Sequence, residues 1–171
     1  MDEVADALDY VQVREDVDPN RIGILGFSSG GATAIMATAR FPTLRAVVAE
    51  GGYGNFVENA LGTGSSSNRA IAYFETNYRW STKLTYRLVT GMDINQLSPV
   101  DVIGNIAPRP ILLIYGSQEV SLPGGRRQKA ATGDNAKLWI VEGAGHGNYV
   151  DVASAEYERR VVTFFDEALL K

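Results

Sequence analysis

The segment 21–40, RIGILGFSSGGATAIMATAR, constrains the fold of this chain more than any other stretch. A short apolar run at 22–25 predicts a buried strand, and the alanine-rich run at 29–40 predicts a helix. Between them stands the Gly-x-Ser-x-Gly pattern of residues 26–30. The chain must turn from strand to helix within a few residues, which forces the central Ser28 into a strained backbone conformation. The context predicts a nucleophile elbow, with the Ser28 hydroxyl at the end of a strand.

The same turn predicts how negative charge would be stabilised. Free N–H groups and the dipole at a helix N-terminus favour a developing oxyanion. Ser29 is a poorer nucleophile candidate than Ser28, but its backbone N–H is expected to point into the oxyanion hole. Side chains in place of Gly26 and Gly30 are expected to collide with the neighbouring strand and helix. A plain glycine-rich turn is the alternative, and the flanking strand and helix favour the nucleophile.

Composition excludes several classes of site. The chain has 171 residues, a net charge of −4 and no basic run dense enough for nucleic acid or an anionic membrane. It has no cysteine, so disulfides, thiolate metal sites and a cysteine nucleophile are excluded. His146 is the single histidine, which excludes a multi-histidine metal site, and no cofactor is implied. No apolar run is long enough to span a membrane and no signal peptide is recognisable, which leaves the compartment unassigned, cytoplasmic by default.

The order of the predicted elements indicates an α/β fold in a single domain, 1–171. Four short apolar runs predict four strands, and the near absence of polar residues in a run such as 44–50 is typical of a parallel strand that is covered on both faces. Segments with apolar residues at helical spacing lie between these runs. This alternation is typical of a mainly parallel sheet of about four strands with helices on both faces. The strands are expected at about 22–26, 44–50, 111–115 and 137–141, and the helices at about 2–13, 29–40, 100–106, within 124–136, and 152–170.

The segment from about 53 to 108 interrupts this alternation. It contains a loop-like stretch at 62–68 and two predicted helices at 69–78 and 83–90. The segment is longer than one crossover helix needs. Either it is an elaborate crossover whose aromatic side chains are core, or it is a small helical cap over the elbow that shapes a substrate pocket; both can hold. The aromatic residues concerned are Tyr73, Phe74, Tyr78, Trp80 and Tyr86.

Three chemically active residues follow three of the predicted strands. Ser28, Glu119 and His146 come after the first, third and fourth strand, and the carboxyl ends of parallel strands converge at one edge of a sheet. A serine hydroxyl needs a base, which His146 can supply. Glu119 can orient the imidazole and stabilise its charged form. The order serine, acid, histidine therefore predicts a catalytic triad.

Alternatives exist for several of these positions. Glu50 and Asp101 are rivals for the acid, although Asp101 fits better as a residue that pins the 98–106 turn. A glutamate after a strand is often solvated surface, and a histidine in a glycine-rich loop can be a turn residue. Tyr53 is expected to line the substrate pocket or, equally, to pack in the core.

The chain resembles the α/β-hydrolase superfamily, in particular its serine esterase, dienelactone-hydrolase-like and prolyl-oligopeptidase-like members. The resemblance covers essentially the whole chain and lies in three motifs, at 18–31, 107–116 and 143–147. It implies Ser28 as nucleophile, Glu119 as acid, where the family usually has aspartate, and His146 as base. It also implies an N-terminal half, because such folds normally have about eight strands.

Without that half, the elbow strand is expected to be an open edge. Either the chain is a fragment of a fold with an N-terminal half, or a partner or a second copy in a homodimer covers this edge, or a rearrangement heals it. The same half would supply the second oxyanion donor, which is typically worth ~3 kcal/mol. We expect a serine hydrolase, a carboxylesterase that cleaves a small-molecule ester through an acyl-enzyme; amides, thioesters and lactones remain open. The alternative is a non-catalytic half-domain that works only by association. A phosphate binder is disfavoured because residues 26–31 fit neither phosphate-binding glycine motif.

Overall fold

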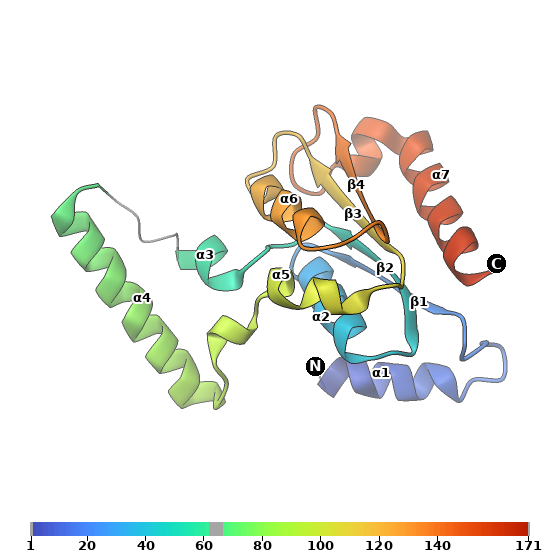
Figure 1. The fold of residues 1–171 in the computed structure, drawn as a ribbon, viewed down its shortest axis with the longest axis horizontal. Helices are drawn as coiled ribbons and strands as arrows, with labels where there is room; N and C mark the ends of the chain where they lie inside the picture. The colour runs from blue at the N-terminus through green and yellow to red at the C-terminus, as the bar shows by residue number, and fades with distance from the viewer. Residues whose placement is uncertain (1, 62–66, 171) are drawn as a thin grey trace.

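The computed structural model describes residues 2–61 and 67–170, and in that part of the chain strands and helices alternate as expected (Figure 1). Most boundaries lie within a residue or two of the predicted ones, although the last helix begins at Tyr149 instead of 152. The elements are α1 (Asp2–Gln12), β1 (Ile22–Phe27), α2 (Ser29–Arg40), β2 (Leu44–Glu50), α3 (Phe56–Leu61), α4 (Arg69–Thr90), the 3-10 helix η1 (Ile94–Gln96), α5 (Pro99–Val102), the 3-10 helix η2 (Ile103–Ile106), β3 (Ile111–Gly116), α6 (Leu122–Ala130), β4 (Ala136–Val141) and α7 (Tyr149–Leu169).

The described strands form one parallel sheet in the order β1-β2-β3-β4, which confirms the predicted fold class. The register places the carboxyl ends of the strands side by side: Phe27 lies beside Glu50, and Glu50 lies beside Ile114. In the next pair Gly116 lies beside Val141. The loops that follow these strands therefore meet at one edge of the sheet, where ligands bind in parallel α/β folds.

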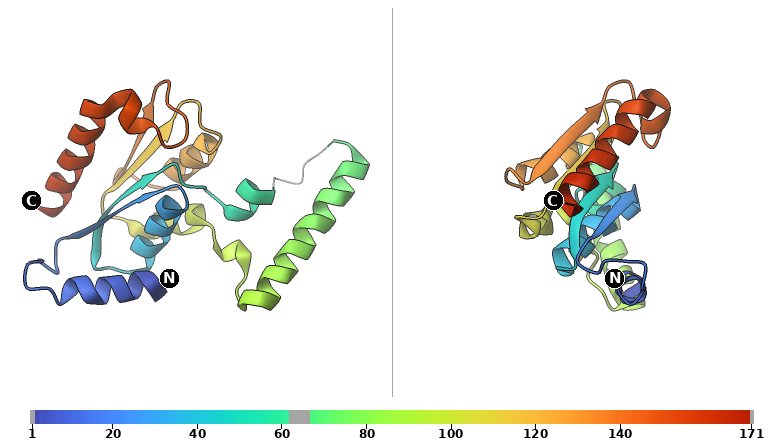
Figure 2. Two further views of the ribbon diagram at one scale, coloured as in Figure 1. Left: turned by 180° about the vertical axis from the view of Figure 1, so that it is seen from behind. Right: turned by 90° about the vertical axis from the view of Figure 1, so that its right-hand side faces the viewer.

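Helices cover both faces of the sheet (Figures 1 and 2). On one face, Ile35 of α2 and Ile103 and Ile106 of η2 pack on the central strands. On the other face, Tyr149 and Phe164 of α7 pack on β2, β3 and β4. The helix α1 closes the end of this core where the strands begin, through a small cluster of Leu8, Ile22, Ala37 and Leu44. The central strands β2 and β3 thus read as near-continuous apolar runs because both of their faces are covered.

β1 is an edge strand in the described sheet, since it pairs with β2 alone. Leu25 and Phe27, on the α7 side of β1, are 44% and 43% exposed. An unpaired strand edge flanked by exposed apolar side chains is a surface on which other polypeptide pairs readily. The expectation that the elbow strand is an open edge is confirmed, and what covers it is taken up below.

The segment 53–108 is helical, but it differs from the prediction in two respects. The two helices expected at 69–78 and 83–90 are one helix, α4, which extends away from the sheet (Figure 1). Its N-cap Asn68 accepts from the N–H groups of Ala70 and Ile71, and Gly91 ends it with φ 72°. The predicted core role of its aromatics is wrong for four of them, which are exposed: Tyr73, Phe74, Tyr78 and Trp80.

Tyr86 is half-buried and faces the domain. The loop expected at 62–68 falls mostly outside the described residues, since 62–66 are not among them. None of the described helices is both long and apolar enough to cross a membrane.

A buried carboxylate links β2 to α7. Glu50 is 5% exposed and accepts a hydrogen bond of 2.6 Å from the Tyr157 hydroxyl. Burial raises the pKa of Glu50, and the hydrogen bond from Tyr157 offsets part of that rise. When the pKa of a carboxyl is higher in the folded state than in the unfolded state, its protonated form stabilises the fold. This stabilisation is complete below the unfolded-state pKa and is lost as the pH rises through the folded-state pKa.

We therefore expect Glu50→Gln to gain stability relative to the parent as the pH rises. Glutamine can still accept from Tyr157, and it carries no charge to bury. The gain in the free energy of unfolding should be about 1 kcal/mol at pH 8 and should vanish near pH 4. Urea denaturation at both pH values measures it. A difference that does not change with pH would contradict this account of Glu50.

Candidate active site

Ser28 occupies the turn between β1 and α2 in a conformation that few residues adopt. Its backbone has φ 56° and ψ −121°, and it is the only described residue other than glycine with positive φ. Its N–H donates to the Glu50 carbonyl at 2.7 Å, which holds the turn against β2. As the N-cap of α2, Ser28 stands beside the N–H of Ser29, the first helical residue, which has no partner within the helix. The strain expected at this position is confirmed.

The two glycines of the motif differ in what they contact. A Cβ at Gly26 would lie 2.2 Å from the Gly30 carbonyl oxygen, so this position is closed to side chains as predicted. A Cβ at Gly30 would meet nothing within 4 Å, and the predicted collision there is wrong. The reason is direction, because the Cβ of residue 30 would point away from the strand while that of residue 26 would point into the turn.

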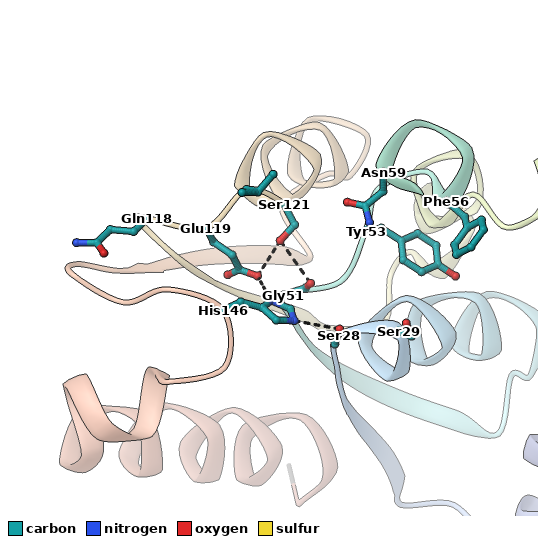
Figure 3. Close-up of a pocket in the computed structure, with 11 residues that line it drawn as sticks. Ser28, Ser29, Gly51, Tyr53, Phe56, Asn59, Gln118, Glu119, Ser121 and His146 are labelled. Carbon is teal, nitrogen blue, oxygen red and sulfur yellow. Dashed lines mark hydrogen bonds and ion pairs between the residues drawn. The ribbon is translucent and has the colours of Figure 1, made fainter. Parts of the chain in front are cut away.

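His146 lies in the loop after β4 and contacts both other predicted residues (Figure 3). Its Nε2 is 3.0 Å from Ser28 Oγ, and its Nδ1 is 2.6 Å from Glu119 Oε1. Phe27 packs beside the imidazole with the ring centroids 4.8 Å apart. Gly147, with φ 90°, lets the loop pass close to Phe27, since a Cβ there would lie 2.8 Å from the ring. The structure therefore brings Ser28, His146 and Glu119 into one hydrogen-bonded chain.

Glu119, in the loop after β3, is held by four hydrogen bonds. Its side chain is 2% exposed. Oε1 contacts His146 Nδ1 and accepts from the Ser121 hydroxyl at 2.7 Å. Oε2 accepts from the Gly116 N–H at 2.8 Å and from the Tyr149 hydroxyl at 2.7 Å. Burial acts to raise the pKa of Glu119, but the hydrogen bonds outweigh it and the pKa is lowered. The carboxylate is thus kept ionised beside His146.

Tyr149 is a donor that the sequence did not single out. Burial, followed by its bond to Glu119, raises the pKa of the Tyr149 hydroxyl, so it keeps its proton. Tyr149→Phe should remove one charge-assisted hydrogen bond and cost about 2 kcal/mol of stability at pH 7. The lowered pKa of Glu119 means that its ionised form stabilises the fold, and this stabilisation is lost as the pH falls below the ordinary carboxyl pKa and the group becomes protonated. The cost of Tyr149→Phe should therefore shrink as the pH falls below about 4. Denaturation at pH 7 and pH 3.5 tests this, and an undiminished cost at pH 3.5 would contradict it.

The rival acids lie elsewhere. Glu50 is engaged with Tyr157, and its carboxylate makes no contact with His146 in the described structure. Asp101 is exposed in the first turn of α5, where its N–H bonds the Ser98 carbonyl, as expected for a residue of that turn. Glu119 is the carboxylate that contacts His146.

A cavity of about 410 Å³ opens beside Ser28. One side of it is aromatic, where Tyr53 packs edge-on against Phe56 with the ring centroids 5.3 Å apart. Burial, and then the proximity of Tyr86, raises the pKa of Tyr53. Tyr53 thus both lines the cavity and packs, so the two alternatives left open for it are compatible. No described residue of α4 lines this cavity.

The sequence did not identify several lining residues. Gly51 is the most constrained, because a Cβ there would lie 2.6 Å from Glu119 Oε1 and 2.9 Å from His146 Nδ1. Its place directly after the apolar run 44–50 was a usable signal in the sequence, and its φ of 58° explains why a glycine stands there. Ser121 also lines the cavity and is two residues from Glu119, which was a weaker signal. Tyr149 does not line the cavity; it bonds Glu119 and is three residues from His146. The remaining unpredicted lining residues are Phe56, Asn59, Gln118 and Val120.

Among the residues that the structure describes, no cluster of three histidine, cysteine or acidic side chains is placed to hold a metal ion. The site is instead built from a hydroxyl, an imidazole and a carboxylate. These three groups can transfer a proton and form a covalent bond to an electrophilic carbon.

A parallel sheet with a strained serine after one strand and a histidine after another defines an α/β hydrolase. Residues 1–171 match the family model described as the prolyl oligopeptidase family, and the chain belongs to that family. No curated protein matches the chain at a significant level.

Solved structures with similar folds include α/β hydrolases and a protein of unassigned function. A hypothetical protein of Pseudomonas aeruginosa superposes with a TM-score of 0.72 at 22% identity, over 98% of this chain and 67% of that one. The α/β hydrolase GrgF of Penicillium gives 0.70 at 13% identity, over 99% and 71%. An esterase of Pyrococcus furiosus gives 0.62 at 19% identity, over 98% and 61%. The chain thus spans from about three fifths to about seven tenths of the length of these three proteins, and at such identities the likeness is one of fold.

Proposed function

We propose that the protein is a serine hydrolase that cleaves carboxylic esters. The observation that carries the proposal is the chain of hydrogen bonds from Ser28 through His146 to Glu119. A cavity beside Ser28 is wide enough for a small acyl group. The family match supports hydrolysis as the class of reaction. The comparisons do not favour the alternative of a non-catalytic half-domain.

The proposed reaction has two halves. His146 Nε2 takes the proton from Ser28 Oγ as the oxygen attacks the ester carbonyl carbon, and the imidazolium then gives that proton to the departing alcohol. Water next attacks the acyl-enzyme, with His146 again as base, and releases the acid and the free serine. Glu119 stays ionised throughout and stabilises the imidazolium. The N–H of Ser29 is proposed to donate to the oxyanion of both tetrahedral intermediates.

The cavity suggests a small ester. Tyr53, Phe56 and Val120 give it an apolar side, while Asn59 and Gln118 give it uncharged hydrogen-bonding groups. None of these five carries a charge that would select a charged acyl group. One structural neighbour is named an esterase and another an acylaminoacyl peptidase, so amides are the natural competitors.

We propose further that additional polypeptide pairs with the free edge of β1 in the working protein, either the N-terminal half of the fold or a second copy. Pairing would cover Leu25 and Phe27, and it would bring a second oxyanion donor to Ser28. One such donor is worth about 10²–10³ in kcat. If that polypeptide is an N-terminal half, the 171-residue chain alone is expected to be a slow esterase that this half, supplied in trans, accelerates; if it is a second copy, activity is expected to rise with dimerisation.

The test compares nitrophenyl acetate and butyrate with the nitroanilide of the same acids. The proposal predicts measurable ester hydrolysis, with the acetyl or butyryl ester preferred over longer chains and over both anilides. Anilide cleavage as fast as ester cleavage would overturn the substrate class. Absence of any hydrolysis by the folded chain would overturn the reaction.

A further inference from the structure

The helix α4 turns a mainly polar side toward the domain and an apolar side toward solvent, which is the reverse of an ordinary surface helix. Six of its residues are half-buried, and they form one stripe at helical spacing that faces α3 and η1. That stripe is mainly polar: Ala72, Glu75, Arg79, Thr82, Lys83 and Tyr86. A surface helix of a monomer normally turns its apolar side to the core instead.

The apolar side of α4 points away from the domain. Eight large side chains lie on it, each between 40% and 79% exposed, with small polar residues such as Asn77 and Ser81 between them and no charged residue. Figure 1 shows why, since α4 stands apart from the sheet with its outer side free. We call these residues the outer face of α4: Ile71, Tyr73, Phe74, Tyr78, Trp80, Leu84, Leu88 and Val89.

We propose that the outer face of α4 binds the outer face of a second copy of this chain, forming a symmetric dimer. Exposed aromatic side chains commonly bury 150–250 Å² each, so covering this face on two copies removes more than about 1,000 Å² from water, which a specific interface requires. The composition also fits an interface core, which is rich in tyrosine, tryptophan and phenylalanine and depleted of charge. The largest apolar patch on a typical monomer is only about 300–600 Å².

A lipid surface is the competing occupant, and charge argues against it. The chain has a net charge of −4 and a pI of about 5.0, which disfavours anionic bilayers. Of the four basic residues of α4, Arg79 and Lys83 belong to the stripe that faces the domain, and only Arg69 and Arg87 are exposed, one near each end of the helix. A second copy needs no such charge, because the outer face is uncharged along its length.

The test is sedimentation velocity over about a hundredfold range of protein concentration, on the parent and three variants. Phe74→Glu and Trp80→Glu each place a charge in the outer face. Val13→Glu is the matched control, because Val13 lies outside α4 and, at 79% exposed, is as accessible as Val89. Circular dichroism verifies that each variant is folded.

The proposal predicts a dimer in the parent and in Val13→Glu. Each charge in α4 should weaken dimerisation by at least about 30-fold, as expected for an interface hot spot. A parent that is monomeric throughout would overturn it. A dimer equally stable in all variants would also overturn it and point to another surface, such as the edge of β1. Binding of a monomeric parent to phosphatidylcholine–phosphatidylserine vesicles, lost in the α4 variants, would assign the face to lipid instead. None of these readouts depends on hydrolysis.

Discussion

Replacing His146 with alanine is expected to lower kcat for a short-chain ester by about 10⁵-fold, with little change in KM. Among the residues that the structure describes, the imidazole is the group that hydrogen-bonds Ser28 Oγ, and His146 is the single histidine of the sequence. Without it, the serine proton has no acceptor within reach, and the leaving alcohol has no donor. Initial rates with nitrophenyl butyrate, after removal of any contaminating esterase, measure the loss.

A control variant separates this effect from damage to the loop. Asn148 lies two residues away and its side chain accepts from the Gly145 N–H at 2.8 Å, so Asn148→Ala loosens the loop but keeps the imidazole. It is expected to lower kcat by no more than about 10-fold, because a single neutral hydrogen bond is worth about 1 kcal/mol. If His146→Ala and Asn148→Ala lost activity equally, the role of His146 as base would have to be abandoned.

Gly26→Ala is expected to have the largest effect on stability, a loss of about 4 kcal/mol in the free energy of unfolding. The new Cβ would lie 2.2 Å from the carbonyl oxygen of Gly30 and 2.5 Å from its carbonyl carbon, both backbone atoms that cannot rotate away. Relief requires β1 and the start of α2 to separate, which would also displace Ser28. Guanidinium denaturation followed by circular dichroism measures the change.

Gly30→Ala provides the matched comparison within the same motif. Nothing lies within 4 Å of a Cβ at that position, and alanine is the better helix former by about 1 kcal/mol. We expect this variant to be as stable as the parent or slightly more stable. Equal destabilisation by the two substitutions would show that backbone freedom, and not the close approach at Gly26, explains the glycines of the motif.

Much of the fold was predictable because its causes are local. Short runs of almost only apolar residues, such as 44–50 and 111–115, predict strands that are buried on both faces, and the structure shows both runs as buried strands. The meeting of Ser28, Glu119 and His146 was predictable for a topological reason, since parallel strands end at a common edge. The chemical roles of these three residues stay predictions until they are tested by substitution.

Other features depend on contacts that no local pattern encodes. Two helices were expected, at 69–78 and 83–90, with a short join at 79–82, yet nothing in that join stops a helix, and Gly91 is the first residue that does. The sequence showed that this segment is rich in aromatic residues but not which way their side chains face. The four hydrogen bonds of Glu119 were hidden for the same reason, because Tyr149 and Ser121 become donors only when the loops after β3 and β4 meet.

The central claim is that Ser28 is the nucleophile, and labelling with an alkyl fluorophosphonate followed by peptide mass spectrometry tests it most directly. Such a probe reacts with a serine only where a neighbouring base activates it. The account predicts one labelled residue, Ser28, in the parent and equal labelling in Ser154→Ala, whose substitution lies on the exposed side of α7. It predicts no labelling in Ser28→Ala. A Ser28→Ala protein that labels as strongly as the parent would contradict the account.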